Sequence, residues 1–323
     1  MVEVGDLLLA MYGATSGDIA VSKIKGAINQ AILCIRTKQN KKFIESVWNK
    51  HVSKNLRKYL QGGQGNLSAD IVKGISFFFP TSKEQEKIAN LVSLLDERIA
   101  TQNKIIDKLQ SLIKGLEDNL LDNPLWEKTY LRSFMQFFPT NSLSWEQLSY
   151  KEGAIRNLHY GLIHSFQTRG INSASLPMIK NEAIPKQYTL CQVGDVAFAD
   201  ASEDTGEIAK SVEFVDTIEG NTICGLHTIH GRDIKNRTVV GFKGFAFNSR
   251  YFHNQIKRLA QGTKVFSITA NNLSSCYVYL SDLETQKAIV NLLKTYEAKL
   301  LVSKRLLEHY EKQKQYLLRQ MFI

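Results

Sequence analysis

The stretch VGDLLLAMYGATSGDIA at residues 4–20 occurs again, in the similar form VGDVAFADASEDTGEIA, at residues 193–209. The two stretches are offset by 189 residues (193 minus 4) and share a Val-Gly-Asp opening. A second set of matches has an offset of 200: Gln61-Gly62 with Gln261-Gly262, Glu84 with Glu284, and Lys87 with Lys287. A repeat of this length far exceeds the roughly 20–50 residues of solenoid repeats. The sequence therefore predicts a duplicated domain, with about eleven extra residues (200 minus 189) in the second copy.

Each copy is followed by a stretch in which mostly apolar residues recur with alternating spacings of four and three. The first seam comprises Ile88, Val92, Leu95, Ile99, Gln102, Ile106, Leu109, Ile113, Leu116 and Leu120. The second comprises Ile289, Leu293, Tyr296, Leu300, Ser303, Leu307, Tyr310, Lys314, Leu317 and Met321. This period of about 3.5 residues predicts two helices that pair with each other as an antiparallel coiled coil, with Gln102 and Ser303 as polar positions that fix the register. Two surface helices of separate domains remain the alternative.

The regions between the long helices mix strand and helix patterns. We predict strands at residues 6–10, 31–36, 76–79, 195–199, 238–242 and 275–280. We predict shorter helices at residues 41–59 and 249–260. The predicted fold class is α+β: two mixed α/β domains separated by two long helices. The expected boundaries are 1–82 for the first domain, 83–125 for its helix, 126–281 for the second domain and 282–323 for the last helix.

The composition favours a polyanionic partner. The chain has 323 residues, a net charge of +10 and a pI near 9.3, which is typical of proteins that bind nucleic acid. No apolar run approaches the roughly 20 residues of a membrane-spanning helix, so we expect no membrane association. The cysteines lie far apart in sequence, which argues against zinc or a disulfide scaffold and favours reduced thiols in a cytoplasmic protein: Cys34, Cys191, Cys224 and Cys276.

Motifs of common DNA-modifying and nucleotide-binding enzymes are missing from the sequence. None of the five prolines adjoins another, so the Pro-Pro loop with which adenine methyltransferases grip a flipped base is absent. No Gly-Lys dipeptide occurs, which excludes a P-loop. The spacing of His159, His164, His227 and His230 is poor for a metal site. We therefore expect no catalytic residues, no cofactor and no metal.

Several motifs resemble those of the specificity subunits of type I restriction–modification systems. They are Gly5-Asp6-Leu7-Leu8-Leu9-Ala10-Met11-Tyr12-Gly13-Ala14-Thr15-Ser16-Gly17, His159-Tyr160-Gly161-Leu162-Ile163, Gly225-Leu226-His227-Thr228-Ile229, and the helix openings at Glu84 and Glu284. The resemblance covers nearly the whole chain, in the order recognition domain, helix, recognition domain, helix. It implies a non-catalytic subunit in which each target-recognition domain reads one half of a split site in double-stranded DNA. It also implies that the helices pair as a spacer and dock two modification (methyltransferase) subunits, and that restriction subunits join the assembly.

Polar residues near these motifs are candidates for DNA contacts, with ordinary solvated surface as the alternative for each. The candidates are Thr15, Ser16, Gln64, Tyr160, His164, Gln167, Arg169 and Lys264.

The two copies differ in length before the Val-Gly-Asp block. The second copy has about 65 residues there and the first has three, so we expect an incomplete and less stable first recognition domain.

Two other classes of protein remain open. A coiled-coil scaffold without DNA recognition would show no salt-dependent binding to duplex DNA. A stand-alone modification enzyme would transfer methyl groups as the purified chain.

Overall fold

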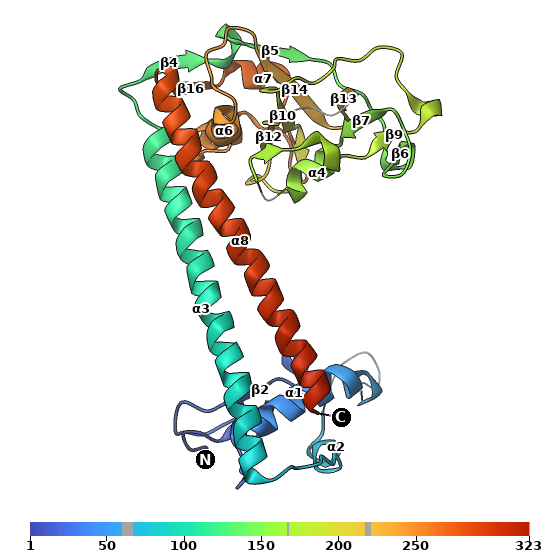
Figure 1. The fold of residues 1–323 in the computed structure, drawn as a ribbon, viewed down its shortest axis with the longest axis vertical. Helices are drawn as coiled ribbons and strands as arrows, with labels where there is room; N and C mark the ends of the chain where they lie inside the picture. The colour runs from blue at the N-terminus through green and yellow to red at the C-terminus, as the bar shows by residue number, and fades with distance from the viewer. Residues whose placement is uncertain (60–66, 167, 217–220, 323) are drawn as a thin grey trace. The chain divides into compact units, whose positions relative to one another are not determined.

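The fold comes from a computed structural model, which describes residues 1–59, 67–166, 168–216 and 221–322. Tertiary contacts divide the chain into two units. Unit 1 comprises residues Met1–Ile106 and Val302–Ile323, and unit 2 comprises Asp107–Leu301. Two helices run from one unit into the other, α3 (Ser82–Leu121) and α8 (Leu283–Met321) (Figure 1). The structure confirms the predicted class of mixed α/β domains with two long helices.

Unit 1 is built on a three-stranded antiparallel sheet in the order β2-β1-β3. Its elements are β1 (Leu7–Ala10), the 3-10 turn η1 (Gly13–Thr15), β2 (Ile19–Val21), β3 (Ile32–Ile35), α1 (Lys41–Tyr59) and α2 (Ala69–Lys73). Leu9 and Met11 are buried with Trp48 of α1, whose indole N–H donates to the carbonyl of Gly17 (2.8 Å). No strand in the described part of the chain pairs with the outer side of β2 or β3.

Unit 2 contains a five-stranded sheet, β5-β14-β10-β12-β8, and a four-stranded sheet, β13-β7-β9-β6 (Figure 1). Two smaller sheets pair β16 with β4 and β11 with β15. The strands are β4 (Glu127–Tyr130), β5 (Met135–Phe138), β6 (Leu148–Ser149), β7 (Ile155–Leu158), β8 (Gly170–Ile171), β9 (Met178–Ile179), β10 (Val196–Ala199), β11 (Ala201–Ser202), β12 (Ser211–Phe214), β13 (Asn221–Cys224), β14 (Thr228–Asp233), β15 (Phe266–Ser267) and β16 (Tyr277–Leu280). The helices are α4 (Tyr160–Ser165), α5 (Phe242–Ala246), α6 (Arg250–Leu259) and α7 (Ala270–Ser275), with 3-10 turns η2 (Leu131–Ser133), η3 (Trp145–Gln147), η4 (Ser173–Ser175) and η5 (Asn181–Ala183).

The sequence repeat is also a structural repeat. Strand β10 begins 189 residues after β1 (196 minus 7), and β12-β10-β14 repeats the order and antiparallel pairing of β2-β1-β3. The glycine of each Val-Gly-Asp block has a positive φ, +87° at Gly5 and +88° at Gly194, where a side chain would be strained. The same turn therefore leads into the central strand of both sheets.

The structure corrects the sequence alignment after this strand. Gly17 donates its N–H to Ala10 O (2.8 Å), and the residue that makes the equivalent bond to Ala199 O (3.0 Å) is Ala209 rather than Gly206. Both Gly17 and Ala209 have positive φ. Three of the extra residues of the second copy thus lie before this point, and the match of Gly17 with Gly206 is out of register.

The start of each long helix is a second repeated feature, and its true offset is 201 rather than 200. Gln85 is buried, accepts from the N–H of Asn40 (3.2 Å) and donates to Pro80 O (3.0 Å). Gln286 is buried in the same way, accepting from Val239 N (3.1 Å) and donating to Ser281 O (3.0 Å). Each helix is therefore joined to its own domain by one glutamine amide. The matches of Glu84 with Glu284 and Lys87 with Lys287 are one residue out of register.

The two long helices are antiparallel in both units. In unit 1, Asp96 of α3 pairs with Lys314 of α8, and Gln102 Nε2 donates to Ser303 O (3.1 Å). In unit 2, the C-terminal end of α3 and the first turns of α8 share one hydrophobic core. None of the seam residues is exposed. Among them, Val92, Leu95, Gln102, Ile106, Ile113, Ile289 and Leu293 are buried, and Ile88, Ile99, Leu109, Leu116, Leu120, Tyr296, Leu300, Ser303, Leu307, Tyr310, Lys314, Leu317 and Met321 are half-buried.

The predicted strands at 6–10, 31–36, 195–199 and 275–280 are confirmed as β1, β3, β10 and β16. The predicted helix at residues 41–59 is α1, and that at 249–260 is α6 with its two cap residues, Ser249 and Ala260. The predicted strands at 76–79 and 238–242 are wrong. The first is an extended segment without a pairing partner, in which Phe78 is 97% exposed. In the second, Asp233 accepts from the N–H of Thr238 (2.8 Å) and so holds a turn before α5.

Within the described ranges, no helix is both long enough and apolar enough to span a lipid bilayer.

Candidate DNA interface

One buried carboxylate holds the repeated segment of unit 2. Asp195 is 1% exposed and accepts hydrogen bonds from Arg232 Nε and Nη2 (both 2.8 Å) and from the backbone N–H of Gln192 (2.8 Å). His230 Nε2 lies 2.7 Å from its Oδ2. Burial raises the pKa of Asp195, but the hydrogen bonds from Arg232 and His230 outweigh it and hold the pKa below its ordinary value. A charged carboxylate therefore anchors the start of β10.

Aromatic rings gather around the N-terminus of α4. His159 caps this helix, because its Nδ1 accepts from the N–H of Gly161 (3.2 Å). The centroid of its ring lies 4.4 Å from that of Trp145 and 4.8 Å from that of Tyr160, and Tyr160 meets the exposed His227 edge-on at 5.3 Å. Burial lowers the pKa of His159, and the charge of His227 lowers it further, which keeps the capping nitrogen free to accept. The predicted residue Tyr160 is thus half-buried and belongs to a rigid aromatic stack.

The loop at residues 200–207 is bonded to α4 through its acidic end. Glu207 Oε2 lies 3.3 Å from His164 Nδ1 and 2.9 Å from Lys210 Nζ. Burial raises the pKa of Glu207, but the hydrogen bonds from Lys210 and His164 lower it by more. At the other end of the loop, Asp200 Oδ1 contacts His227 Nδ1 at 3.0 Å. The structure therefore brings the predicted residues Tyr160 and His164 together beside one polar loop.

Lys264 lies on a connection that reaches the same loop. Strand β15 pairs with β11, so Ser267 lies opposite Ala201, and the loop before β15 carries the exposed side chain of Lys264. The preceding helix α6 ends with two further exposed cations, Lys257 and Arg258. No ion pair to these three cations is found in the described part of the chain. Exposed cations of this kind are suited to phosphate contacts. The Lys-Arg pair that closes α6 is the sequence signal that would have identified two of them.

Two of the predicted DNA-contacting residues, Ser16 and Arg169, bond to other parts of the protein instead. Ser16 is buried, and its hydroxyl donates to the carbonyl of Met11 (3.1 Å), so it holds a turn, whereas its neighbour Thr15 is exposed. The backbone N–H of Arg169 donates to Glu297 of α8 (2.9 Å), and its guanidinium lies 3.5 Å from Glu117 of α3. Arg169 therefore joins its domain to the helix pair and is not free to read a base.

Gln64 and Gln167, also predicted as DNA-contacting residues, lie outside the residues that the structure describes.

Two of the cysteines that lie far apart in sequence meet in the fold. Cys191 and Cys224, 33 residues apart in sequence, are buried neighbours with their sulfur atoms 3.6 Å apart, and His230 lies beside them. A wide spacing along the chain did not exclude a cluster because β13 and the segment before β10 pack together in the fold.

Comparisons with known proteins show which sequences and structures this chain is similar to. The family model of the type I restriction modification DNA specificity domain matches residues 2–111. The type I restriction enzyme MjaVIII specificity subunit of Methanocaldococcus jannaschii is 24% identical over 97% of this chain and 77% of its own length.

Solved structures match the fold over almost the entire chain. The crystal structure of the type I restriction–modification system S subunit from M. genitalium matches with a TM-score of 0.62 at 13% identity, covering 100% of this chain and 84% of that one. A structure reported for complex assembly and conformational transition of the type I R-M system matches with a TM-score of 0.60 at 14% identity, covering 99% and 82%. The chain is therefore similar in sequence to a type I restriction enzyme specificity subunit, most clearly over residues 2–111, and it shares the fold of solved type I S subunits.

Proposed function

We propose that the chain reads a bipartite DNA site, one half with each recognition domain, and supplies no chemistry of its own. The observation that carries this proposal is the duplication. The chain holds two copies of one domain, and each copy is bonded to its own long helix by a buried glutamine, Gln85 or Gln286. A pair of related readers on paired helices is suited to two separated half-sites. Methyl transfer and cleavage then belong to the subunits that assemble with the chain.

In the second domain we assign DNA contact to the surface around the 200–207 loop. Tyr160 and His164 offer polar edges beside this loop, and Lys257, Arg258 and Lys264 offer unpaired positive charges. Phosphate contacts from such cations give affinity, and polar side chains at base edges give sequence preference. The surface thus combines both kinds of contact that a non-catalytic reader needs.

We assign docking of the two modification subunits to the outer faces of α3 and α8, with restriction subunits joining that assembly. Both helices carry large apolar side chains that are exposed and lie off the seam. They are Leu91, Leu94, Ile105 and Leu112 on α3, and Leu292, Val302, Leu306 and Tyr316 on α8. Exposed apolar side chains in rows on a helix support a protein interface better than contact with DNA.

Selection of bound duplexes from a random pool, with the modification subunits present, tests the proposal. We expect a sharp half-site from the second domain, whose repeated strands are flanked by β5 and β8, and a weaker one from the first. Lys264→Ala should weaken all duplexes alike and lower the log–log salt slope by about 0.9. Loss of His164 should change the selected sequence. Mapping methylated adenines in cells with and without the gene gives the same site independently.

Three outcomes contradict the proposal. Selection without any sequence preference, or binding that does not depend on salt, indicates a coiled-coil scaffold. Methyl transfer by the purified chain indicates an enzyme. Two equally sharp half-sites would support the proposal and contradict only the expected weakness of the first half-site.

A further inference from the structure

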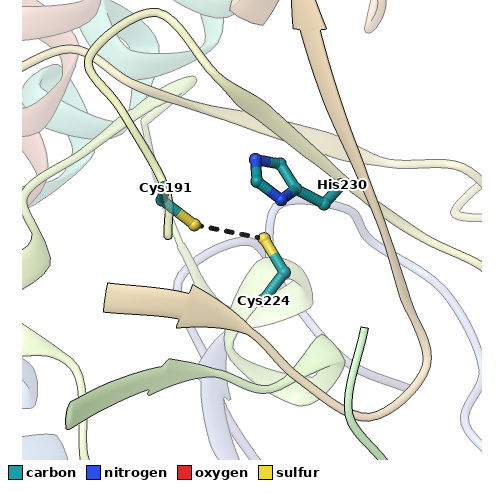
Figure 2. A group of neighbouring side chains, drawn as sticks. All are labelled: Cys191, Cys224 and His230. Atoms are coloured by element: carbon teal, nitrogen blue, oxygen red, sulfur yellow. Dashed lines mark hydrogen bonds between the residues drawn. The ribbon is translucent and has the colours of Figure 1, made fainter. Parts of the chain in front are cut away.

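Three potential metal ligands from separate segments meet in the interior of unit 2. Cys191 precedes the Val-Gly-Asp turn, Cys224 ends β13 and His230 lies in β14. All three are buried, and their ligand atoms lie within 4.8 Å of one another. Figure 2 shows the two sulfur atoms facing each other with the His230 ring beside them. The backbone N–H of Cys191 donates to Thr222 O (2.8 Å), which fixes the two cysteine-bearing segments side by side.

The separation of the sulfur atoms is that of two ligands on one metal ion. Zinc–sulfur bonds of about 2.3 Å in tetrahedral geometry place two sulfur atoms roughly 3.8 Å apart. The observed distance between Cys191 Sγ and Cys224 Sγ is 3.6 Å. A disulfide requires about 2.05 Å, so the two sulfur atoms would have to approach by about 1.5 Å to form one. The geometry is closer to shared coordination.

The histidine is oriented as zinc-bound histidines are. His230 Nε2 lies 2.7 Å from Asp195 Oδ2, and Arg232 holds the same carboxylate in place. This contact leaves Nδ1 as the ring nitrogen free to bind a metal. A carboxylate that holds the other nitrogen of a ligating histidine fixes its tautomer and raises its basicity. Asp195 is therefore a positioning residue and not a ligand.

The net charge of the metal-loaded site is compatible with its burial. Two thiolates and one divalent cation sum to zero, and a neutral imidazole adds nothing, so the loaded site carries no net charge into the protein interior. The first copy lacks this set of three potential ligands. Val2 occupies the position of Cys191 at the offset of 189, and Cys34 occupies that of His230, as the matching contacts of Cys34 with Asp6 and of His230 with Asp195 show.

We propose that Cys191, Cys224 and His230 form a structural site for a thiophilic divalent cation, Zn²⁺ in the first instance, with water in the fourth position. The ion links β13, β14 and the segment that enters β10. It thereby fastens the part of the domain that precedes the Val-Gly-Asp block to the repeated core. This role is independent of DNA reading and of the helices.

Cobalt titration of the reduced, metal-free full-length chain tests the site. One equivalent of Co²⁺ should produce thiolate-to-metal charge-transfer absorption, and Zn²⁺ should abolish it by displacement. Cys191→Ser and Cys224→Ser should remove the absorption, and Asp195→Asn should weaken binding about 10–100-fold. Cys276→Ser and Cys34→Ser are the matched controls and should leave it unchanged. Circular dichroism confirms that each variant is folded, and Cys224→Val serves where the serine variant is not.

Zinc should also raise the thermal unfolding midpoint of the unmodified chain and not that of Cys224→Val. Absorption that is absent, or that persists in both Cys191→Ser and Cys224→Ser, overturns the proposal. So does a chain that is isolated with Cys191 and Cys224 joined, two hydrogens lighter by mass, and that binds no cobalt after reduction. That result identifies a redox pair instead.

Discussion

The two copies of the recognition domain repeat one network almost bond for bond. In the first, Asp6 accepts from Arg36 Nε (3.1 Å) and from Glu3 N (2.9 Å), and Arg36 Nη2 donates to Met1 O (3.0 Å). In the second, Asp195, Arg232, Gln192 and Leu190 make the same set of bonds. The three-stranded sheet repeats as well, and so does the buried glutamine that bonds each long helix to its own domain, Gln85 or Gln286. The Val-Gly-Asp core therefore has the same local bonding in both copies.

The copies differ in what is added to that core. In unit 2 the added segment supplies β5 and β8, which cover the two edges of the repeated sheet. Unit 2 also buries an ion pair, with Lys243 Nζ 3.0 Å from Glu213 Oε1. Val21 pairs with Leu7 as Glu213 pairs with Val196, so the first copy has an apolar residue at this position. The core of three strands is therefore the same in both copies, and the features specific to unit 2 lie around it.

The largest expected effect comes from removing one partner of the buried ion pair between Lys243 and Glu213. Glu213→Ala should cost about 3–5 kcal/mol in unfolding free energy, because it leaves the buried charge of Lys243 without a counter-charge and with only its hydrogen bond to Thr238 Oγ1 (2.9 Å). It also removes the acceptor of the N–H groups of Gly241 and Gly244 (both 2.8 Å). Val21→Ala, the matched change in the first copy, should cost much less. Urea unfolding of both variants measures the difference. Equal losses would show that the two positions are energetically equivalent.

The next effect concerns the helix seam in each unit. Leu109→Glu in unit 2 and Leu307→Glu in unit 1 should each lower the unfolding free energy by about 2–4 kcal/mol, since each places a charge in a half-buried apolar layer. Thermal melting measures the loss, and the exposed neighbours Lys108→Glu and Arg305→Glu are charge controls. Unchanged melting of both leucine variants would show that the helices do not pack on these faces in solution.

A smaller effect tests whether the glutamine joints are equivalent. Gln85→Leu and Gln286→Leu should each cost about 1–3 kcal/mol, because each leaves backbone groups at a domain–helix junction without a partner. Amide hydrogen exchange at Asn40 and Val239, whose N–H groups donate to these glutamines, should quicken by similar factors. A loss of stability in only one of the two variants would show that Gln85 and Gln286 are not equivalent.

The smallest effect is a contrast in pH dependence between carboxylates of the two long helices. Burial raises the pKa of Asp96, but hydrogen bonds from Lys314 and Lys42 outweigh it and hold the pKa below 3.8, so this contribution to stability is lost as pH falls through the folded value. Burial raises the pKa of Glu117 and Glu297 above 4.5, so stability falls as pH rises from 4.5 to the folded values and is constant above them.

Unfolding of Asp96→Asn and Glu297→Gln across this pH range checks both signs. The first variant should lose part of the acid-side decline, and the second should lose part of the decline above 4.5. The same pH profile in both variants and in the unmodified chain would contradict the contrast.

Much of the fold could be predicted from sequence because its signals are local. The seams, α1 and α6 follow from residue spacing, and the duplication follows from a block whose glycine and aspartate are each required by a turn and a bond. The register shift at Ala209 could not be predicted, because the chance Gly-Glu-Ile-Ala match conceals three inserted residues.

Long-range packing explains the remaining errors at the candidate site. Arg169 is a polar residue after a family-like motif, yet its partners Glu117 and Glu297 lie more than 50 and more than 120 residues away along the chain. The same limit hid the cluster of Cys191, Cys224 and His230, whose members meet only when β13 and β14 pack. Spacing along the chain carries no signal for contacts of this kind.

The open sheet of unit 1 has a consequence for the behaviour of the chain in solution. The outer sides of β2 and β3 present backbone groups that no described strand pairs, and such edges are templates for strands of other molecules. Lys23 and Lys25 follow β2 with exposed side chains; Lys25 pairs with Glu3 (2.9 Å), so the positive charge that opposes the approach of an identical edge comes from Lys23. Self-association at high concentration should therefore begin at the first copy, and replacing Lys23 with a neutral residue should promote it.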